Sequence, residues 1–114
     1  MTIHINWPGY GGRIHAFETH PIGTAFKPLG GVYIFCKARP DGYWDAIYVG
    51  ETGDFNERLN AALQRHQAWP ACCAHGATHI GVMVIGSVLD RAPRLALETE
   101  LRHTLNPPCN RQAA

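Results

Sequence analysis

The sequence predicts an α+β (α/β sandwich) fold with elements in the order β-β-α-β-α, in which helices flank a three-stranded antiparallel sheet. Two neighbouring apolar runs, 31–37 and 43–50, are rich in β-branched and aromatic residues, and a third run covers 79–88. Helical periodicity follows the second and the third run. A length of 114 residues, with 46% apolar and 17% charged residues, is typical of one globular domain with its own core.

Residues 1–29 are predicted to form a partly irregular N-terminal arm, because glycine and proline interrupt them repeatedly. A short strand or edge segment over 13–17 is compatible with this pattern. The folded domain is then expected to cover residues 30–110, followed by a tail of residues 111–114.

A β-hairpin is predicted next. Pro40-Asp41-Gly42 has turn chemistry, because proline presets φ, aspartate can bond its own backbone and glycine accepts positive φ. If the strands pair, Tyr33 and Tyr48 lie close together on one face of the sheet. Glycines beside both tyrosines would leave room for a bulky ligand to approach the backbone. On the hairpin alone, ordinary strand residues are the simpler interpretation of both tyrosines.

The first helix is predicted to begin at Asp54, because Asp54 and Glu57 resemble a capping box. Its end is expected near Trp69, since Pro70 cannot continue a helix. A loop over 70–78 then leads to the third strand.

The second helix is predicted to begin at Asp90, with Pro93 tolerated in its first turn. Its core stripe consists of Leu97, Leu101 and Leu105. Glu98 lies one step round from this stripe, and Glu100 is expected to point towards solvent. Two consecutive prolines after the stripe stop the helix.

The net charge limits how a nucleic acid could bind, and the cysteine content indicates the redox compartment. With a formal net charge of +1, a nucleic acid would have to be held by a local basic patch. The four cysteines lack C-x-x-C spacing and indicate reduced thiols in the cytoplasm. The first 20 residues contain no signal-peptide run, and the segment 80–89 is too short to span a bilayer, so no membrane partner is expected.

A series of short motifs occurs in order along these elements. They read G-V-Y at 31–33, Y-V-G at 48–50, G-D-F-N-E-R-L at 53–59, L-E-T-E-L at 97–101 and P-P-C-N at 107–110. At these spacings and on these elements, the chain resembles the GIY-YIG nuclease domain over about residues 30–110. The resemblance implies a metal-dependent endonuclease that hydrolyses phosphodiester bonds in DNA, either with low sequence specificity or with selectivity for DNA structure.

The resemblance also implies roles for the motif residues. Glu98 would be the protein ligand of a single divalent cation, Mg²⁺ or Mn²⁺, and Arg58 would contact the scissile phosphate. Tyr33 and Tyr48 would hold the attacking water, with Tyr33 as general base. Asn110 would fix the site through its amide. On the helices alone, Glu98 is more simply a solvated carboxylate, and Arg58 could equally be a surface partner of an acidic residue one turn earlier.

Two positions depart from the family pattern. Ala62 stands where many members carry His or Tyr one turn after the arginine, and His66 is the nearest substitute proton acceptor. A histidine at such a place is more often a surface residue. Glu51 stands where many members have Lys after Y-I-G, and an acidic group there would weaken the local attraction of a phosphate.

Basic residues that could hold DNA follow the strand-to-helix edges. The candidates are Lys37, Arg39, Arg58 and Arg65. Trp44 or Trp69 could stack on an unpaired base. A solvated surface explains most of these charges equally well. The sequence does not decide between a monomer, a homo-oligomer and a complex with a protein partner.

Two alternatives remain. The same domain could be a catalytically weak nucleic-acid-binding or partner-docking module, which Ala62 and Glu51 favour slightly. A zinc site is the other alternative, with ligands of the right type at His66, Cys72, Cys73, His75 and His79. Their spacing matches no finger pattern, and adjacent cysteines chelate poorly.

Overall fold

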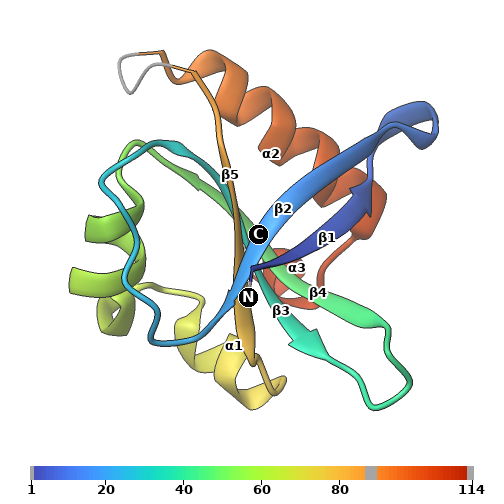
Figure 1. The fold of residues 1–114 in the computed structure, drawn as a ribbon, viewed down its shortest axis with the longest axis horizontal. Coiled ribbons are helices and arrows are strands. Elements are labelled where there is room, and N and C mark those ends of the chain that lie inside the picture. The colour runs from blue at the N-terminus through green and yellow to red at the C-terminus, as the bar shows by residue number, and fades with distance from the viewer. Residues whose placement is uncertain (1, 87–89, 113–114) are drawn as a thin grey trace.

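The structure is a computed structural model that describes residues 2–86 and 90–112 of the chain. Within these residues the chain forms an antiparallel sheet of five strands in the order β1-β2-β5-β3-β4. The strands are β1 (Ile3–Pro8), β2 (Ile14–Pro21), β3 (Gly31–Ala38), β4 (Trp44–Thr52) and β5 (His79–Val84). Figure 1 shows the sheet as a strongly twisted layer. Its two edges are β1 and β4.

The predicted fold, a β-β-α-β-α sandwich with a three-stranded sheet, is wrong. Residues 1–29, expected to form a partly irregular arm, contribute β1 and β2. β2 pairs with β5, with Glu18 opposite Val82, so it lies inside the sheet. β1 then pairs with β2 and forms the edge.

The glycines and prolines of this segment mark the ends of strands and do not interrupt them. Pro8 ends β1, Pro21 ends β2, and the turn between them contains the short helix η1 (Tyr10–Gly12). In β2, Phe17 and Thr19 are buried between neighbours that are more exposed, which is the alternation of a half-buried strand. Turn residues placed so close together concealed the two strands.

The predicted hairpin is confirmed. Arg39 C=O accepts from the N–H of Gly42 at 3.1 Å, and Gly42 has a φ of 88°. The aromatic rings of Tyr33 and Tyr48 lie 6.3 Å apart between centroids. The expectation that the glycines leave room for a ligand is wrong at Gly50, because a Cβ there would collide with the ring of Tyr33. The space beside Gly50 is filled by the protein itself.

The first predicted helix is broken into two short pieces, η2 (Glu57–Ala61) and η3 (Leu63–Arg65). The predicted loop over 70–78 is partly wrong, because a further helix, α1 (Trp69–Ala74), begins where the first helix was expected to end. Asp54 caps the first piece as predicted, since its Oδ1 accepts from the N–H of Glu57 at 3.1 Å. Ala62 N–H then bonds to Glu57 C=O at 2.7 Å, which is a π-helical turn. The backbone of His66 is extended, and Pro70 lies in the first turn of α1 and does not end a helix.

The last third of the chain follows the prediction more closely. β5 ends at Val84; the predicted extension to 88 falls partly on residues 87–89, which lie outside the described residues. In α2 (Ala92–Leu105) the residues Leu97 and Leu101 are buried. Asn106, in the left-handed conformation with a φ of 46°, ends this helix. The predicted tail partly belongs to a further short helix, α3 (Pro108–Gln112), while residues 113–114 lie outside the described residues.

Hydrophobic side chains pack on both faces of the sheet. On one face, Phe17, Val32 and Ile34 pack with Leu97 and Leu101 of α2. On the other face, the buried side chains that pack with η2, η3 and α1 are Tyr33, Phe35, Tyr48, Leu59, Leu63 and Trp69. Figure 1 shows α2 (orange) on one side of the strands and the shorter helices (green to yellow) on the other, with α3 beside β4. No helix in the described part of the chain is long and apolar enough to cross a membrane.

Because β2 lies within the sheet, its buried face should contribute strongly to stability. We expect Phe17→Ala to lower the free energy of unfolding by about 3–5 kcal/mol, since it empties a fully buried aromatic position. Ile14→Ala on the same strand, where the side chain is 56% exposed, should change it by no more than about 0.5 kcal/mol. Urea unfolding followed by circular dichroism measures both. Equal small effects would show that β2 is only loosely attached.

Candidate functional site

The candidate site is built around the phenol of Tyr33, near the start of β3. Its oxygen lies 2.7 Å from Nε2 of His66 and 3.4 Å from Nε of Arg58. Arg58 belongs to η2 and His66 follows η3, so three separate segments meet at one oxygen atom. The Tyr33 side chain is only 1% exposed. Such contacts matter there, because an unpaired buried polar group costs about 1–3 kcal/mol.

The backbone at Ala68 fixes the tautomer of His66. Ala68 N–H donates to Nδ1 of His66 at 3.1 Å, so Nδ1 carries no proton. Burial, together with the positive charge of Arg58, lowers the pKa of His66 from 6.5 to about 4. The ring is therefore neutral at pH 7, and its single proton is on Nε2. His66 then donates a hydrogen bond to Tyr33 and is not free to accept the phenol proton. The hypothesis that His66 is a substitute proton acceptor does not fit this arrangement.

The pKa values of Tyr33 and Tyr48 are both raised, and for similar reasons. Burial raises the pKa of Tyr33, while the hydrogen bond from Arg58 opposes the shift. Burial also raises the pKa of Tyr48, and the charge of Glu98 adds to it. The carboxylate of Glu98 acts on both phenols, and the guanidinium of Arg58 does so as well. These four side chains therefore form one electrostatic cluster.

Two helix residues cover the outer edge of β4. The side chain of Asn110, on α3, accepts from the N–H of Val49 at 2.7 Å and donates to its C=O at 2.8 Å. The backbone of Glu51, on β4, lies close enough to the carboxylate of Glu98, on α2, to favour its charged form and so lower its pKa. β4 is an edge strand, so its outward backbone groups need such partners. Asn110 and Glu98 therefore hold α3 and α2 against the strand that carries Tyr48.

The environment of Glu98 is partly buried and contains charges of both signs. Burial raises the pKa of its carboxyl group, and the nearby carboxylate of Glu51 adds to the shift. The guanidiniums of Arg102 and Arg91 oppose it. Glu98 is therefore not the fully solvated carboxylate that the helix pattern alone would indicate.

Glu51, the acidic departure from the family pattern, is not a free negative charge. Its carboxylate is buried and lies 2.8 Å from Nε of Arg91 and 3.1 Å from Nε of Arg94. Arg94 is itself buried, at 4% exposed. The two guanidiniums offset the charge that was expected to weaken phosphate binding. No pattern in the sequence predicted this pairing.

A metal ion at this site would have one protein carboxylate. Among the residues that the structure describes, no three His, Cys, Asp or Glu side chains gather in a way that could hold a metal. Glu51, the other carboxylate near Glu98, is engaged with two arginines. Glu98 thus offers a single hard oxygen ligand, a donor that fits Mg²⁺ or Mn²⁺ with water completing the coordination. His66, one of the zinc candidates, uses both ring nitrogens in other contacts.

The other predicted nucleic-acid contacts do not join this cluster. Lys37 and Arg39 lie four and six residues beyond Tyr33 along the hairpin, or roughly 13–20 Å at 3.3 Å per residue. Arg39 is already paired with Asp41 and Asp45. Arg65 is exposed on η3, next to His66.

Of the two predicted stacking residues, one is in the core. Trp69 is 7% exposed and packs against the ring of Phe35, so it is not available to a base. Trp44 is half-buried, with the ring of His79 4.8 Å from its own. Glu100, expected in solvent, instead accepts from the N–H of Tyr10 at 2.9 Å and so ties α2 to the β1–β2 turn.

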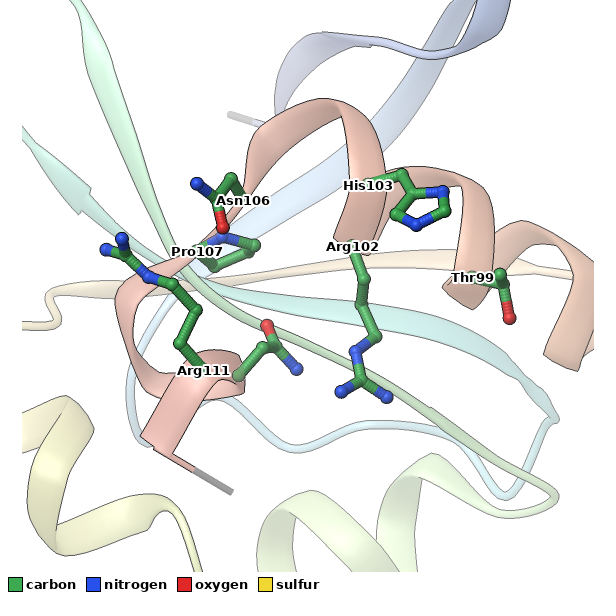
Figure 2. Close-up of a pocket in the computed structure, with 7 residues that line it drawn as sticks. Thr99, Arg102, His103, Asn106, Pro107 and Arg111 are labelled. Carbon is green, nitrogen blue, oxygen red and sulfur yellow. The ribbon is translucent and has the colours of Figure 1, made fainter. Parts of the chain in front are cut away.

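A cavity beside the site was missed by sequence reasoning. It lies between α2 and α3, and its lining includes Arg102, Arg111 and the site residue Asn110. Figure 2 shows Arg102 extending from α2 and Arg111 from α3, on opposite sides of the pocket in that view. The available signal was the i, i+4 spacing from Glu98 to Arg102, which places both on one face of the helix.

The cysteines are free thiols in the described part of the chain. Cys72 on α1 and Cys109 on α3 are buried; burial raises the pKa of Cys72, and the neighbouring thiol of Cys109 adds to the shift.

Comparisons of this chain with family models, curated proteins and solved structures find no match.

The buried, neutral state of His66 should appear as a pH-dependent loss of stability. The pKa of His66 is lower in the folded state, so the unfolded state binds the proton first as the pH falls. Stability from this group is complete above pH 6.5 and is lost as the pH falls from 6.5 to about 4. Between pH 7 and pH 4, we expect the free energy of unfolding to fall by about 3 kcal/mol more in the wild type than in His66→Gln.

Urea unfolding at a series of pH values measures this difference. Nitrogen-15 NMR of the histidine rings should also show His66 as the Nε2–H tautomer with a titration midpoint near pH 4. Parallel stability curves for the two proteins, or a His66 midpoint near 6.5, would contradict the assigned environment.

Proposed function

We propose that this chain is a metal-dependent endonuclease that hydrolyses phosphodiester bonds in DNA, with a site that resembles those of GIY-YIG nucleases. The observation that carries the proposal is the contact of Tyr33 with both Arg58 and Tyr48, together with the charge of Glu98, which acts on both phenols from α2. These residues come from different elements, and a phosphodiester needs a cationic contact, a held water and a metal ligand together.

Arg58 is suited to contact the scissile phosphate. It uses Nε for the phenol of Tyr33, which orients the guanidinium and leaves its terminal N–H groups for a ligand. Among the described residues no carboxylate forms an ion pair with Arg58, so its charge can act on a phosphate. A guanidinium stays protonated and can donate to two phosphate oxygens at once.

Tyr33 and Tyr48 are proposed to hold the attacking water. The oxygen of Tyr33 accepts from His66 and Arg58, so its own O–H points away from both and would be free to contact a water or a phosphate oxygen once the site opens. Burial raises the pKa of this phenol. Removal of its proton would therefore depend on stabilisation of the phenolate by nearby cations. Tyr33 is proposed as the general base, with His66 as the residue that positions it.

Mg²⁺ or Mn²⁺, held by Glu98, would supply positive charge near the leaving oxygen of the phosphodiester. Asn110 would keep α3, and with it this edge of β4, in place. We propose DNA as the partner, with low sequence specificity or selectivity for DNA structure. The free thiols are compatible with a reducing compartment, and we propose the cytoplasm.

A nucleic-acid-binding or partner-docking module with little cleavage is the second candidate, and the burial of Tyr33 favours it. A phenol that is 1% exposed cannot reach a substrate unless the site opens. The raised pKa of this phenol also makes it a poor base in the state described here. This module would retain the contacts of Arg58 and lose the proton transfer.

Cleavage assays separate the two candidates. Purified protein is incubated with labelled duplex, single-stranded, flap and branched DNA in the presence of Mg²⁺, Mn²⁺ or EDTA. We expect metal-dependent cleavage of at least one substrate. Glu98→Gln and Arg58→Gln should each lower the rate by on the order of 100-fold or more, because each removes charge stabilisation at the phosphate.

Glu100→Gln is the matched control, because it removes a carboxylate from the same helix in contact with His15 and outside the cluster. It should retain cleavage close to the wild-type rate. Binding without cleavage of any substrate would support the module. Cleavage that is unchanged in Glu98→Gln would overturn the proposed site.

A further inference from the structure

The cavity between α2 and α3 has the chemistry of an anion site. Its volume is about 300 Å³, and its lining consists of Thr99, Arg102, His103, Asn106, Pro107, Asn110 and Arg111. The lining contains two guanidiniums and an imidazole, together with neutral hydroxyl and amide groups, and it contains no carboxylate. Both arginines are exposed, and among the described residues no carboxylate lies within ion-pair distance of either one.

The walls of this cavity are held in place by contacts outside it. The side chain of Asn110 is fixed by its two hydrogen bonds to Val49. Nδ1 of His103 lies 3.0 Å from the hydroxyl of Tyr10, so only Nε2 of that ring remains for a ligand. Arg102 and His103 line this cavity from α2 and Arg111 lines it from α3; in Figure 2 the guanidiniums of Arg102 and Arg111 lie on opposite sides of it.

The cavity adjoins the candidate site through Asn110 and Arg102. Asn110 lines the cavity and also covers the edge of β4 next to Tyr48. Arg102 acts electrostatically on both Glu98 and Tyr48. A group bound between Arg102 and Arg111 would therefore lie next to a phosphodiester held at Glu98 and Arg58.

We propose that the cavity between α2 and α3 binds a phosphate of the DNA strand next to the scissile one, through Arg102 and Arg111. This inference rests on the proposed function and extends it to the path of the strand, which leaves the site along α2 towards α3. Guanidiniums suit this role, because they donate to two phosphate oxygens and carry a permanent charge. Such contacts fix the register of the strand without reading its sequence.

Binding measured in EDTA tests the proposal separately from cleavage. Fluorescence anisotropy with a labelled DNA substrate is recorded over a range of salt concentrations for the wild type, Arg102→Gln, Arg111→Gln and the double variant. Each single change should weaken binding by about tenfold at low salt. Each should also reduce the slope of log K against log salt concentration by about one, because one phosphate contact is lost.

Lys27→Gln is the control, since it removes one exposed positive charge that lines a different cavity. It should leave the salt slope unchanged. A second measurement uses inorganic phosphate alone: the side-chain Nε–H signals of Arg102 and Arg111 should shift in NMR spectra as phosphate is added to the wild type.

The outcomes are distinguishable. If the wild type binds and cleaves DNA but the arginine variants keep its affinity and salt slope, the strand path is wrong and the nuclease proposal stands. Phosphate shifts at both arginines without any effect of the variants on DNA binding would also overturn the strand path, since the cavity would then hold only the free anion. If the wild type neither binds nor cleaves any of the DNA substrates, both the strand path and the proposed function fail.

Discussion

The site depends on the buried oxygen of Tyr33. This atom joins β3 to η2 through Arg58 and to the segment after η3 through His66. Because the ring is almost completely enclosed, the hydrogen bonds of its oxygen must come from the protein or from a molecule that enters the site. The tautomer of His66, fixed by the backbone at Ala68, determines the direction of one of these bonds. The hydrogen bond from Arg58 to the same oxygen orients its guanidinium, so the buried Tyr33 determines where this positive charge lies.

Charge around this oxygen is arranged in compensating groups. Glu51 is shared by Arg91 and Arg94, whereas Glu98 is partly buried with Arg102 near it. The pairing of Glu51 matters because an uncompensated buried carboxylate would be costly and would also repel a phosphate. Its compensation leaves Glu98 as the acidic group beside the edge of β4, and within the described ranges no carboxylate forms an ion pair with Arg58. Glu51, the residue that departs from the motif of the family that the sequence resembles, therefore joins β4 to the start of α2 through its two arginine partners.

The sequence predicted the hairpin, its turn, the cap at Asp54 and the core stripe of α2, because each of these depends on neighbouring residues. It did not predict the pairing of β2 with β5, which is a contact across about sixty residues that local pattern cannot show. It also did not predict the break at His66, where a polar side chain turns into the core to meet Tyr33 and ends the helix. Likewise, the gathering of Tyr33, Arg58 and Glu98 was expected only from resemblance, since tertiary packing brings them together. Pairing of Glu51 with Arg91 and Arg94 had no signal at all in the sequence.

The side chains of Asn110 and Glu98 at the outer edge of β4 also limit how this domain can bind another strand. Edge strands commonly recruit a peptide or a second subunit by β-augmentation, in which the incoming strand pairs with the outward N–H and C=O groups. On β4 the N–H and C=O of Val49 are bonded to Asn110, and the carboxylate of Glu98 lies beside the backbone of Glu51. A strand that added there would have to displace both side chains and so dismantle the candidate site. Strand addition at β4 and an intact candidate site are therefore mutually exclusive states of this domain, which leaves β1 as the edge where growth of the sheet is compatible with the site.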